Sequence, residues 1–179
     1  RLTCFSFGAP ADSLQKSIEE VGIIHPITLI PVGDRFRIVC GHHRAKASSS
    51  LIVNKIPARI LDSKIDDESL LMMNLSENHD HCHYSDIEKG LILSKLSEVG
   101  VSANRIIEMY MPLVNLDQSK KLLDDYLSIS RLNIEIQTLL HEMNIPLRIF
   151  SVFFDWDIES IRSAEKIFSL LRPGANKWR

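Results

Sequence analysis

The chain has 179 residues, of which 45% are hydrophobic and 25% are charged, and its formal net charge is −2. This composition is typical of a globular protein, and no apolar run approaches the roughly 20 residues that a membrane-spanning helix needs, so we expect no membrane partner. The three cysteines have no paired spacing, which favours a reducing, cytoplasmic setting.

The net charge conceals a pattern along the chain. Residues 1–65 carry nine Lys and Arg against five Asp and Glu, whereas residues 66–100 carry two against eight. Residues 101–179 carry ten of each. A basic amino-terminal segment suits an anionic ligand, and the balanced carboxyl-terminal part has no cationic excess that would indicate nucleic-acid binding.

Short strands and helices are expected to alternate in the first third of the chain. Apolar residues at helical spacing indicate helices, and short apolar runs bounded by Gly, Asn or Asp indicate strands. The expected elements are, in chain order, a strand over 2–5, a helix from Asp12 or Ser13 to Gly22, strands over 26–32 and 35–40 joined by the turn at Gly33-Asp34, a helix from Arg44 to about Leu51 and a strand over 56–61.

From residue 66 onward the pattern predicts helices alone. Acidic residues 66–68 mark one helix start, Ser85 caps the next helix, and Gly100 ends it. We therefore expect an α+β domain over 1–80 and an all-helical domain over 81–179, with a polar hinge at 79–83. Further helices are expected over 102–110, 117–127, 133–143, 146–154 and 157–171.

The junction after the strand over 35–40 carries candidate ligand groups. A helix start has unpaired N–H groups and the positive end of the helix dipole, so it favours an anion. Gly41 lets a ligand approach the backbone, and Arg44 offers a planar fork of donors that suits phosphate. These residues predict a phosphate site; the alternative is a tight turn in which His42 and His43 merely cap the helix.

Three clusters follow one another along the chain: Gly22-Ile23-Ile24-His25-Pro26-Ile27, Gly41-His42-His43-Arg44 and Glu77-Asn78-His79-Asp80-His81. Together they resemble the amino-terminal domain of the ParB family of chromosome and plasmid partition proteins, whose fold is shared with sulfiredoxin. In that family the clusters read Gly-x-x-Gln-Pro, Gly-Glu-Arg-Arg and Glu-Asn-x-x-Arg. The resemblance continues through 84–88 and covers roughly residues 1–100. It implies a ParB/sulfiredoxin-like α+β domain followed by helices.

The resemblance also implies a nucleotide site that takes CTP, ATP or ADP with magnesium. Carried over residue by residue, the nucleotide and phosphate contacts fall on Gly22, His25, Pro26, Gly41, His42, His43, Arg44 and His81, and the metal contacts fall on Glu77 and Asn78. Magnesium prefers hard oxygen ligands, which this acid–amide pair supplies. Two arginines of the family pattern are replaced by His43 and His81, which are largely neutral near pH 7, so we expect weaker phosphate binding.

Two functions remain open at this point. The first is a nucleotide-dependent partition protein or DNA-associated regulator, in which bound nucleotide biases dimer contacts. The second is a small-molecule kinase, because Gly-His-His-Arg resembles the ParB-like proteins of the free-serine kinase type; Glu19 and Glu20 are then candidates to face a substrate hydroxyl. Weak nucleotide hydrolysis is also open, and no catalytic residue is assigned.

Other functions fit less well. Nuclease activity has no clustered carboxylates to support it, and sulfiredoxin chemistry is disfavoured because His42 stands where that protein has its reactive cysteine. A scaffold that kept the fold and lost the ligand is a further alternative. The hinge residues His79, His81, Cys82 and His83 are of zinc-ligand types, but alternate spacing in a loop favours a polar hinge over a metal site.

A helix-turn-helix is expected in the helical domain, as in ParB. The helix over 117–127 would then read DNA, with Ser119, Lys120 and Lys121 as the candidate contacts. Against this, Asp124 and Asp125 on the same helix would repel phosphates, and the connection before it lacks the usual turn glycine.

Overall fold

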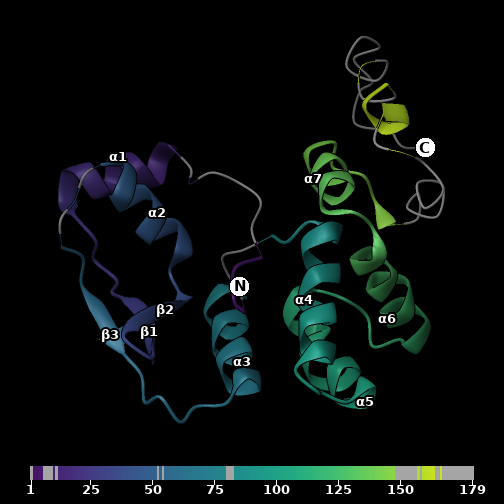
Figure 1. Ribbon diagram of the computed structural model, residues 1–179, viewed down its shortest axis with the longest axis horizontal. Helices are drawn as coiled ribbons and strands as arrows, with labels where there is room; N and C mark the ends of the chain where they lie inside the picture. The colour runs from purple at the N-terminus through teal and green to yellow at the C-terminus, as the bar shows by residue number, and fades with distance from the viewer. Residues whose placement is uncertain are drawn as a thin grey trace. The chain divides into compact units, whose positions relative to one another are not determined.

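The computed structural model describes residues 2–5, 10, 12–51, 53, 55–79, 83–147, 157, 159–163 and 166. The chain divides into two compact units, Arg1–Cys82 and His83–Arg179. The first unit combines a small sheet with helices, and the described residues of the second form helices joined by turns and loops, with no strand among them (Figure 1). This confirms the predicted α+β fold followed by helices.

The sheet of the first unit has three strands in the order β2-β1-β3. β1 (Ile27–Val32) pairs antiparallel with β2 (Arg35–Cys40) and parallel with β3 (Ala58–Ile60). The register pairs Thr28 with Cys40 but Leu29 with Ile38, so Val39 is an extra residue and forms a bulge near the end of β2. The bulge lies directly before the predicted phosphate site.

Three helices complete the described part of this unit. They are α1 (Asp12–Val21), α2 (His42–Ser50) and α3 (Asp67–Asn78). The α2 helix begins two residues earlier than predicted, because Gly41 takes a φ of 90° and turns the chain straight from β2 into the helix. The core between these elements includes the fully buried Val39, Ala47, Leu70, Leu71 and Leu75.

The strand predicted over 2–5 is wrong. Leu2 and Phe5 are buried, and the Thr3 hydroxyl donates to the Ile38 carbonyl over 2.9 Å. The segment is therefore anchored by its side chains, whereas a strand would need a ladder of backbone bonds. Its apolar side chains are buried in the core, and its backbone adds no strand to the sheet.

The α4 helix (Asp86–Glu98) is central to the second unit. It is closed at its start by a capping box between Ser85 and Glu88, and it packs against α6 (Lys120–Leu127) and α7 (Ile134–Glu142). Gly90 makes the close approach possible, because a Cβ there would lie 2.5 Å from Ile129 Cδ1 and 2.9 Å from the Tyr126 carbonyl oxygen.

The helix predicted over 102–110 is present in two parts, α5 (Ala103–Arg105) and a π-helical turn (Ile106–Tyr110). Short 3₁₀ turns follow at Pro112–Val114 and Ser128–Arg131. The helix predicted from 117 begins at Lys120, because Ser119 caps it. Of the last two predicted helices, 148–154 lies outside the described residues, and the other is seen as helix at 159–163 and 166.

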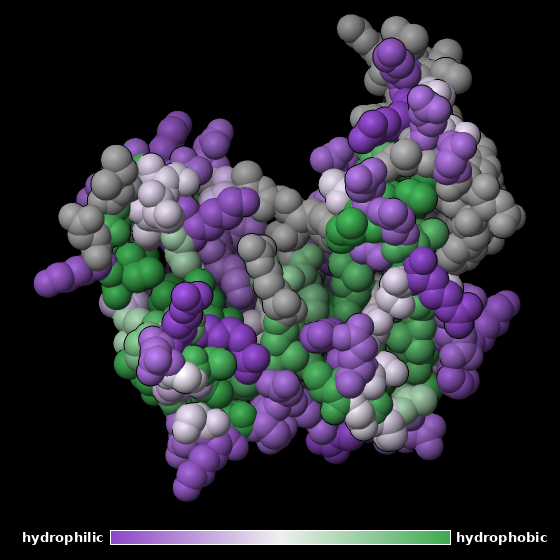
Figure 2. Space-filling model, viewed as in Figure 1, coloured by the Kyte–Doolittle hydropathy of each residue, from purple (hydrophilic) through white to green (hydrophobic). Residues whose placement is uncertain are grey.

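Large apolar side chains of the first unit are exposed on its strands, at the end of α1 and in its loops, and Figure 2 shows hydrophobic surface among polar residues on one face of the molecule. They are Val21, Ile24, Val32, Phe36, Val53 and Ile60. Within the described ranges, no helix has the length and apolar character needed to cross a bilayer.

Candidate phosphate site

The candidate site begins at Gly41, the residue between β2 and α2. Its φ of 90° and ψ of 29° lie in the left-handed region, and a Cβ there would stand 2.8 Å from Ile27 Cγ2 and 3.1 Å from Arg44 Cζ. Glycine is therefore required for both conformation and space. It also offers no side chain to cap α2, whereas Asp66 and Ser85 cap α3 and α4.

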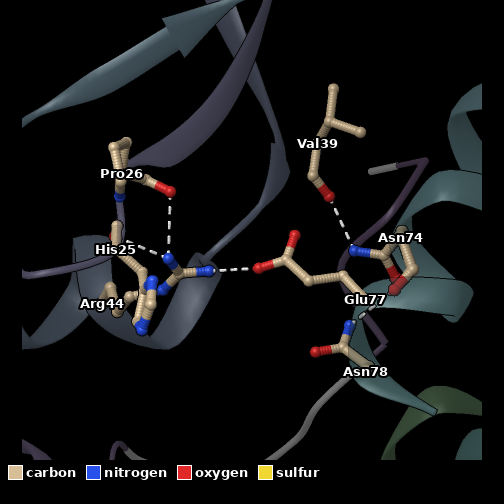
Figure 3. Close-up of polar contacts among 7 residues, drawn as sticks. All are labelled: His25, Pro26, Val39, Arg44, Asn74, Glu77 and Asn78. Atoms are coloured by element: carbon tan, nitrogen blue, oxygen red, sulfur yellow. Dashed lines mark hydrogen bonds and ion pairs between the residues drawn. The ribbon is translucent and has the colours of Figure 1, made fainter.

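The Arg44 guanidinium connects three segments of the first unit (Figure 3). Its Nη1 donates to the carbonyl oxygens of His25 at 2.6 Å and Pro26 at 3.0 Å. Its Nη2 donates to Glu77 Oε1 at 2.5 Å. The first cluster thus contacts Arg44 of the second cluster through its backbone carbonyl oxygens. Glu77 of the third cluster contacts the same guanidinium.

Glu77 and Asn78 lie at the end of α3, where the helix reaches the site. The Glu77 side chain is 40% exposed, against 19% for Arg44, so the carboxylate is the more accessible partner of the pair. Asn78 Nδ2 donates to the Asn74 carbonyl over 2.9 Å, so the donor end of its amide is engaged and its Oδ1 is the atom that would bind a metal. The two residues supply the oxygen donors that magnesium prefers, so they fit that ion.

A buried hydrogen bond holds α3 against the end of β2. Asn74 Nδ2 donates to the Val39 carbonyl over 2.6 Å, and Asn74 is 3% exposed (Figure 3). The extra residue of the β2 bulge thus receives a side-chain bond that sequence periodicity alone did not reveal. A polar residue among the leucines of a helix was the available signal, since buried amides are normally hydrogen-bonded.

The thiol of Cys40 completes the described cluster. Burial, followed by a hydrogen bond to Glu77 and the charge of that carboxylate, raises the pKa of this cysteine to about 12. Cys40 therefore stays a neutral thiol near pH 7. Sequence reasoning placed it on the strand before Gly41 but assigned it no contact.

The remaining predicted residues are placed as follows. Gly22 ends α1 with a φ of 73°, and both His25 and Pro26 are exposed and contribute their carbonyl oxygens to Arg44. His42 and His43 form the first turn of α2 and are half-buried. His81 lies outside the described residues. Glu19 and Glu20, the candidates for a substrate hydroxyl, are exposed on α1.

The other candidate groups lie in the hinge and in the helical unit. Residues 80–82 fall outside the described part of the chain, so the hinge prediction stays a prediction. The described residues hold no cluster of three or more His, Cys, Asp or Glu suited to a metal. Ser119 caps α6, Lys120 pairs with Asp124 at 2.6 Å, and Lys121 is exposed.

Comparison with known proteins gives a family for this arrangement. The family model of the ParB N-terminal domain matches residues 9–79, which include all three clusters up to His79. A protein of Coxiella burnetii described as a probable chromosome-partitioning protein ParB is 28% identical over 137 residues, which are 76% of this chain and 44% of that protein. A protein of Thermus thermophilus described as a probable plasmid-partitioning protein ParB is 27% identical over 111 residues, which are 61% of this chain and 37% of that protein.

The chain thus spans less than half the length of these curated relatives. Two solved structures of C-terminally truncated Caulobacter crescentus ParB are also similar. The form complexed with CTP-gamma-S has 20% identity and a TM-score of 0.36, with 88% of this chain and 84% of that chain covered. The form complexed to the centromeric parS site has 15% identity and a TM-score of 0.46, with 91% and 85% covered. At these values neither likeness assigns a ligand to this chain.

The predicted resemblance is therefore confirmed at the level of the family. The order of the clusters, the α+β unit that carries them and the family match all agree. Residues 9–79 match the ParB N-terminal domain, as the three clusters predict, and the chain is similar to curated ParB partition proteins.

Proposed function

We propose that the first unit binds a nucleoside triphosphate or diphosphate together with magnesium, as part of a ParB-type partition protein. The single observation that carries this is the contact between Arg44 and Glu77, which are 33 residues apart and belong to two different clusters of the ParB N-terminal domain. Two segments that the family pattern associates with phosphate and metal converge on one point.

The chemistry of the converging groups supports this function. Gly41 opens the backbone at the start of α2, and Arg44 supplies a cation with donors in a plane, which together suit a phosphate chain. Glu77 and Asn78 would hold the magnesium, which when bound neutralises phosphate charge. His25 and Pro26 contact Arg44 through their carbonyl oxygens. These two residues would contact the nucleotide, as would Gly22, His42, His43 and His81. CTP is the first candidate, with ATP and ADP as alternatives.

Isothermal titration calorimetry with CTP, ATP and ADP in magnesium buffer tests the proposal. We expect binding of at least one nucleotide by the wild type, and a loss of about tenfold or more in affinity for Arg44→Lys, which keeps the charge but loses the fork. Arg35→Ala removes an exposed arginine of β2 and is the matched control. Absence of heat for every nucleotide, or equal losses for both variants, would refute the proposal.

A kinase of the free-serine type is a second candidate, favoured by the Gly41-His42-His43-Arg44 sequence at the same site. It requires transfer of the terminal phosphoryl group of ATP, or the phosphoryl group of ADP, to a substrate hydroxyl. Incubation of the protein with serine and each nucleotide, followed by mass spectrometry, separates the candidates. Phosphoserine would favour the kinase, and unaltered nucleotide after long incubation would exclude it.

We also propose that the second unit contacts a DNA backbone through the start of α6. The support is local: Lys121 is exposed next to the capped helix start at Ser119, although Lys120 is engaged by Asp124. We expect anisotropy titrations at several salt concentrations to give a slope of log K against log salt that is less steep by about 0.9 for Lys121→Ala than for the wild type. Lys95→Ala on α4, where Lys95 pairs with Glu98, is the control. No binding to any DNA would refute this part.

Dimer formation driven by nucleotide is the remaining expectation. Sedimentation of the protein with and without the magnesium–nucleotide complex tests it directly. A change from monomer to dimer on addition of the nucleotide is the expected result. An unchanged sedimentation coefficient under saturating nucleotide would contradict it.

A further inference from the structure

The Arg44 guanidinium already has a counter-anion in this structure. Its Nη2 donates to Glu77, and its Nη1 donates to two main-chain carbonyl oxygens. A phosphate that approaches Arg44 must therefore compete with a carboxylate for the same donors. The phosphate must also come close to a negative charge, because Glu77 Oε1 lies 2.5 Å from Arg44 Nη2, the nitrogen that the phosphate would bind.

The charges of the cluster cancel. Arg44 and Glu77 contribute one positive and one negative charge. Because Arg44 is only 19% exposed, its attraction for Glu77 is less screened by water than that of a surface pair. This cluster therefore offers a bare polyphosphate no net positive charge.

Glu77 is also held where it is. It lies one helical turn after Asn74, whose buried amide ties α3 to the Val39 carbonyl at the end of β2. This bond thus fixes the part of the α3 backbone that carries Glu77. A divalent cation would compete with Arg44 for the accessible Glu77 carboxylate, because its double charge attracts the carboxylate more strongly. Asn78 lies next to Glu77 in the chain and offers a further oxygen.

We propose that Glu77 is a specificity-determining residue that makes this site select polyphosphates carrying a divalent cation over bare polyphosphates. Without metal, its carboxylate occupies Arg44 in place of a phosphate. With metal, the Glu77 carboxylate would bind the cation instead of Arg44. The Arg44 guanidinium would then be available to the phosphate. This inference rests on the proposed nucleotide function, which it deepens by naming the form of the ligand.

The test measures the affinity for CTP and for inorganic tripolyphosphate by calorimetry, each in magnesium and in EDTA. The wild type should bind both probes at least about tenfold more tightly in magnesium. Glu77→Gln keeps the shape of the side chain without its charge, so it should bind both probes more tightly than the wild type in EDTA. The ratio of magnesium to EDTA affinities should fall several-fold. Glu77→Ala should change the EDTA affinity in the same direction.

Asp67→Asn is the matched control. Asp67 lies on the same helix and pairs with Arg37 at 3.1 Å, so this variant removes an equal charge from an equivalent pair away from the site. It should keep the wild-type ratio. Thermal unfolding of each variant, followed by circular dichroism, verifies that the folded protein is compared.

The outcomes separate the two proposals. A wild type that binds equally with and without metal, or a Glu77→Gln variant with the wild-type ratio and no gain in EDTA, overturns the inference while leaving nucleotide binding intact. Metal-selective binding of tripolyphosphate without binding of any nucleotide overturns the nucleotide function and keeps the inference as a property of a polyphosphate site. If neither probe binds, both are overturned.

Discussion

The side-chain amide of Asn74 on α3 donates to the main-chain carbonyl of Val39 on β2 over 2.6 Å, in a site where Asn74 is 3% exposed. Val39 stands two residues before Gly41, and Asn74 stands three residues before Glu77. The bond therefore sets the separation between the two clusters that form the candidate phosphate site.

Asn74→Ala should destabilise the first unit and weaken nucleotide binding together. The variant leaves the buried Val39 carbonyl without its partner, which costs about 1–3 kcal/mol. Urea unfolding measures the loss, and calorimetry measures the affinity. Ser76→Ala, an exposed change on the same helix, should alter neither. Wild-type stability and affinity in Asn74→Ala would show that the bond does not position α3.

Gly41→Ala should cost more stability than Gly33→Ala. Both glycines have positive φ, 90° and 58°, so both variants strain the backbone by about 1–2 kcal/mol. Only at position 41 does the new Cβ also meet neighbours, Ile27 Cγ2 at 2.8 Å and Arg44 Cζ at 3.1 Å, whereas nothing lies within 4 Å at position 33. Crowding adds about 1–3 kcal/mol and displaces Arg44. Equal losses in urea unfolding would contradict the crowded geometry.

The buried thiol of Cys40 should make the first unit sensitive to alkali. Its pKa is raised from 9.0 to about 12 in the folded protein, first by burial and then by Glu77. The contribution of the neutral thiol to the free energy of unfolding is fully present below the unfolded pKa near 9. This contribution is lost as the pH rises from there toward 12, because the unfolded chain ionises first. The free energy of unfolding of the wild type should therefore fall relative to Cys40→Ala above about pH 9. Parallel pH profiles of the two proteins would contradict it.

The second unit offers an independent test of packing at Gly90. A Cβ at this position of α4 would lie 2.5 Å from Ile129 Cδ1, 2.8 Å from Ile129 Cβ and 2.9 Å from the Tyr126 carbonyl oxygen. Gly90→Ala should therefore lower the free energy of unfolding by about 1–3 kcal/mol, although alanine is the better helix former. Ser97→Ala, at an exposed position of the same helix, is the control. A stabilised Gly90→Ala variant would mean that α4 and its neighbours are further apart.

The convergence of the clusters could be anticipated from the sequence, because the three motifs occur in family order and in the expected strand and helix context. The state of Arg44 could not. Its donors are engaged by the main-chain oxygens of His25 and Pro26 and by the carboxylate of Glu77, and such contacts depend on backbone direction and rotamer. The motif predicts which groups lie close together, but it does not predict which of them form hydrogen bonds with one another.

Local conformation explains the other differences. The sequence pattern predicts the start of α2 at Arg44, but the left-handed Gly41 begins the helix at His42. The apolar segment at 2–5 has a composition that suits a strand, yet the bond from Thr3 to the Ile38 carbonyl and the burial of its neighbours hold it without one. Alternation in so short a segment does not distinguish a strand from an extended segment packed by its side chains.

A crystal structure of the protein grown with magnesium and CTP would show whether Arg44 and Glu77 form the phosphate and metal site. We expect the metal about 2.0–2.1 Å from a Glu77 carboxylate oxygen, and the Arg44 guanidinium against a phosphate oxygen, its bond to Glu77 broken. A nucleotide bound elsewhere on the chain, or bound beside an Arg44–Glu77 pair that stays intact, would contradict the account.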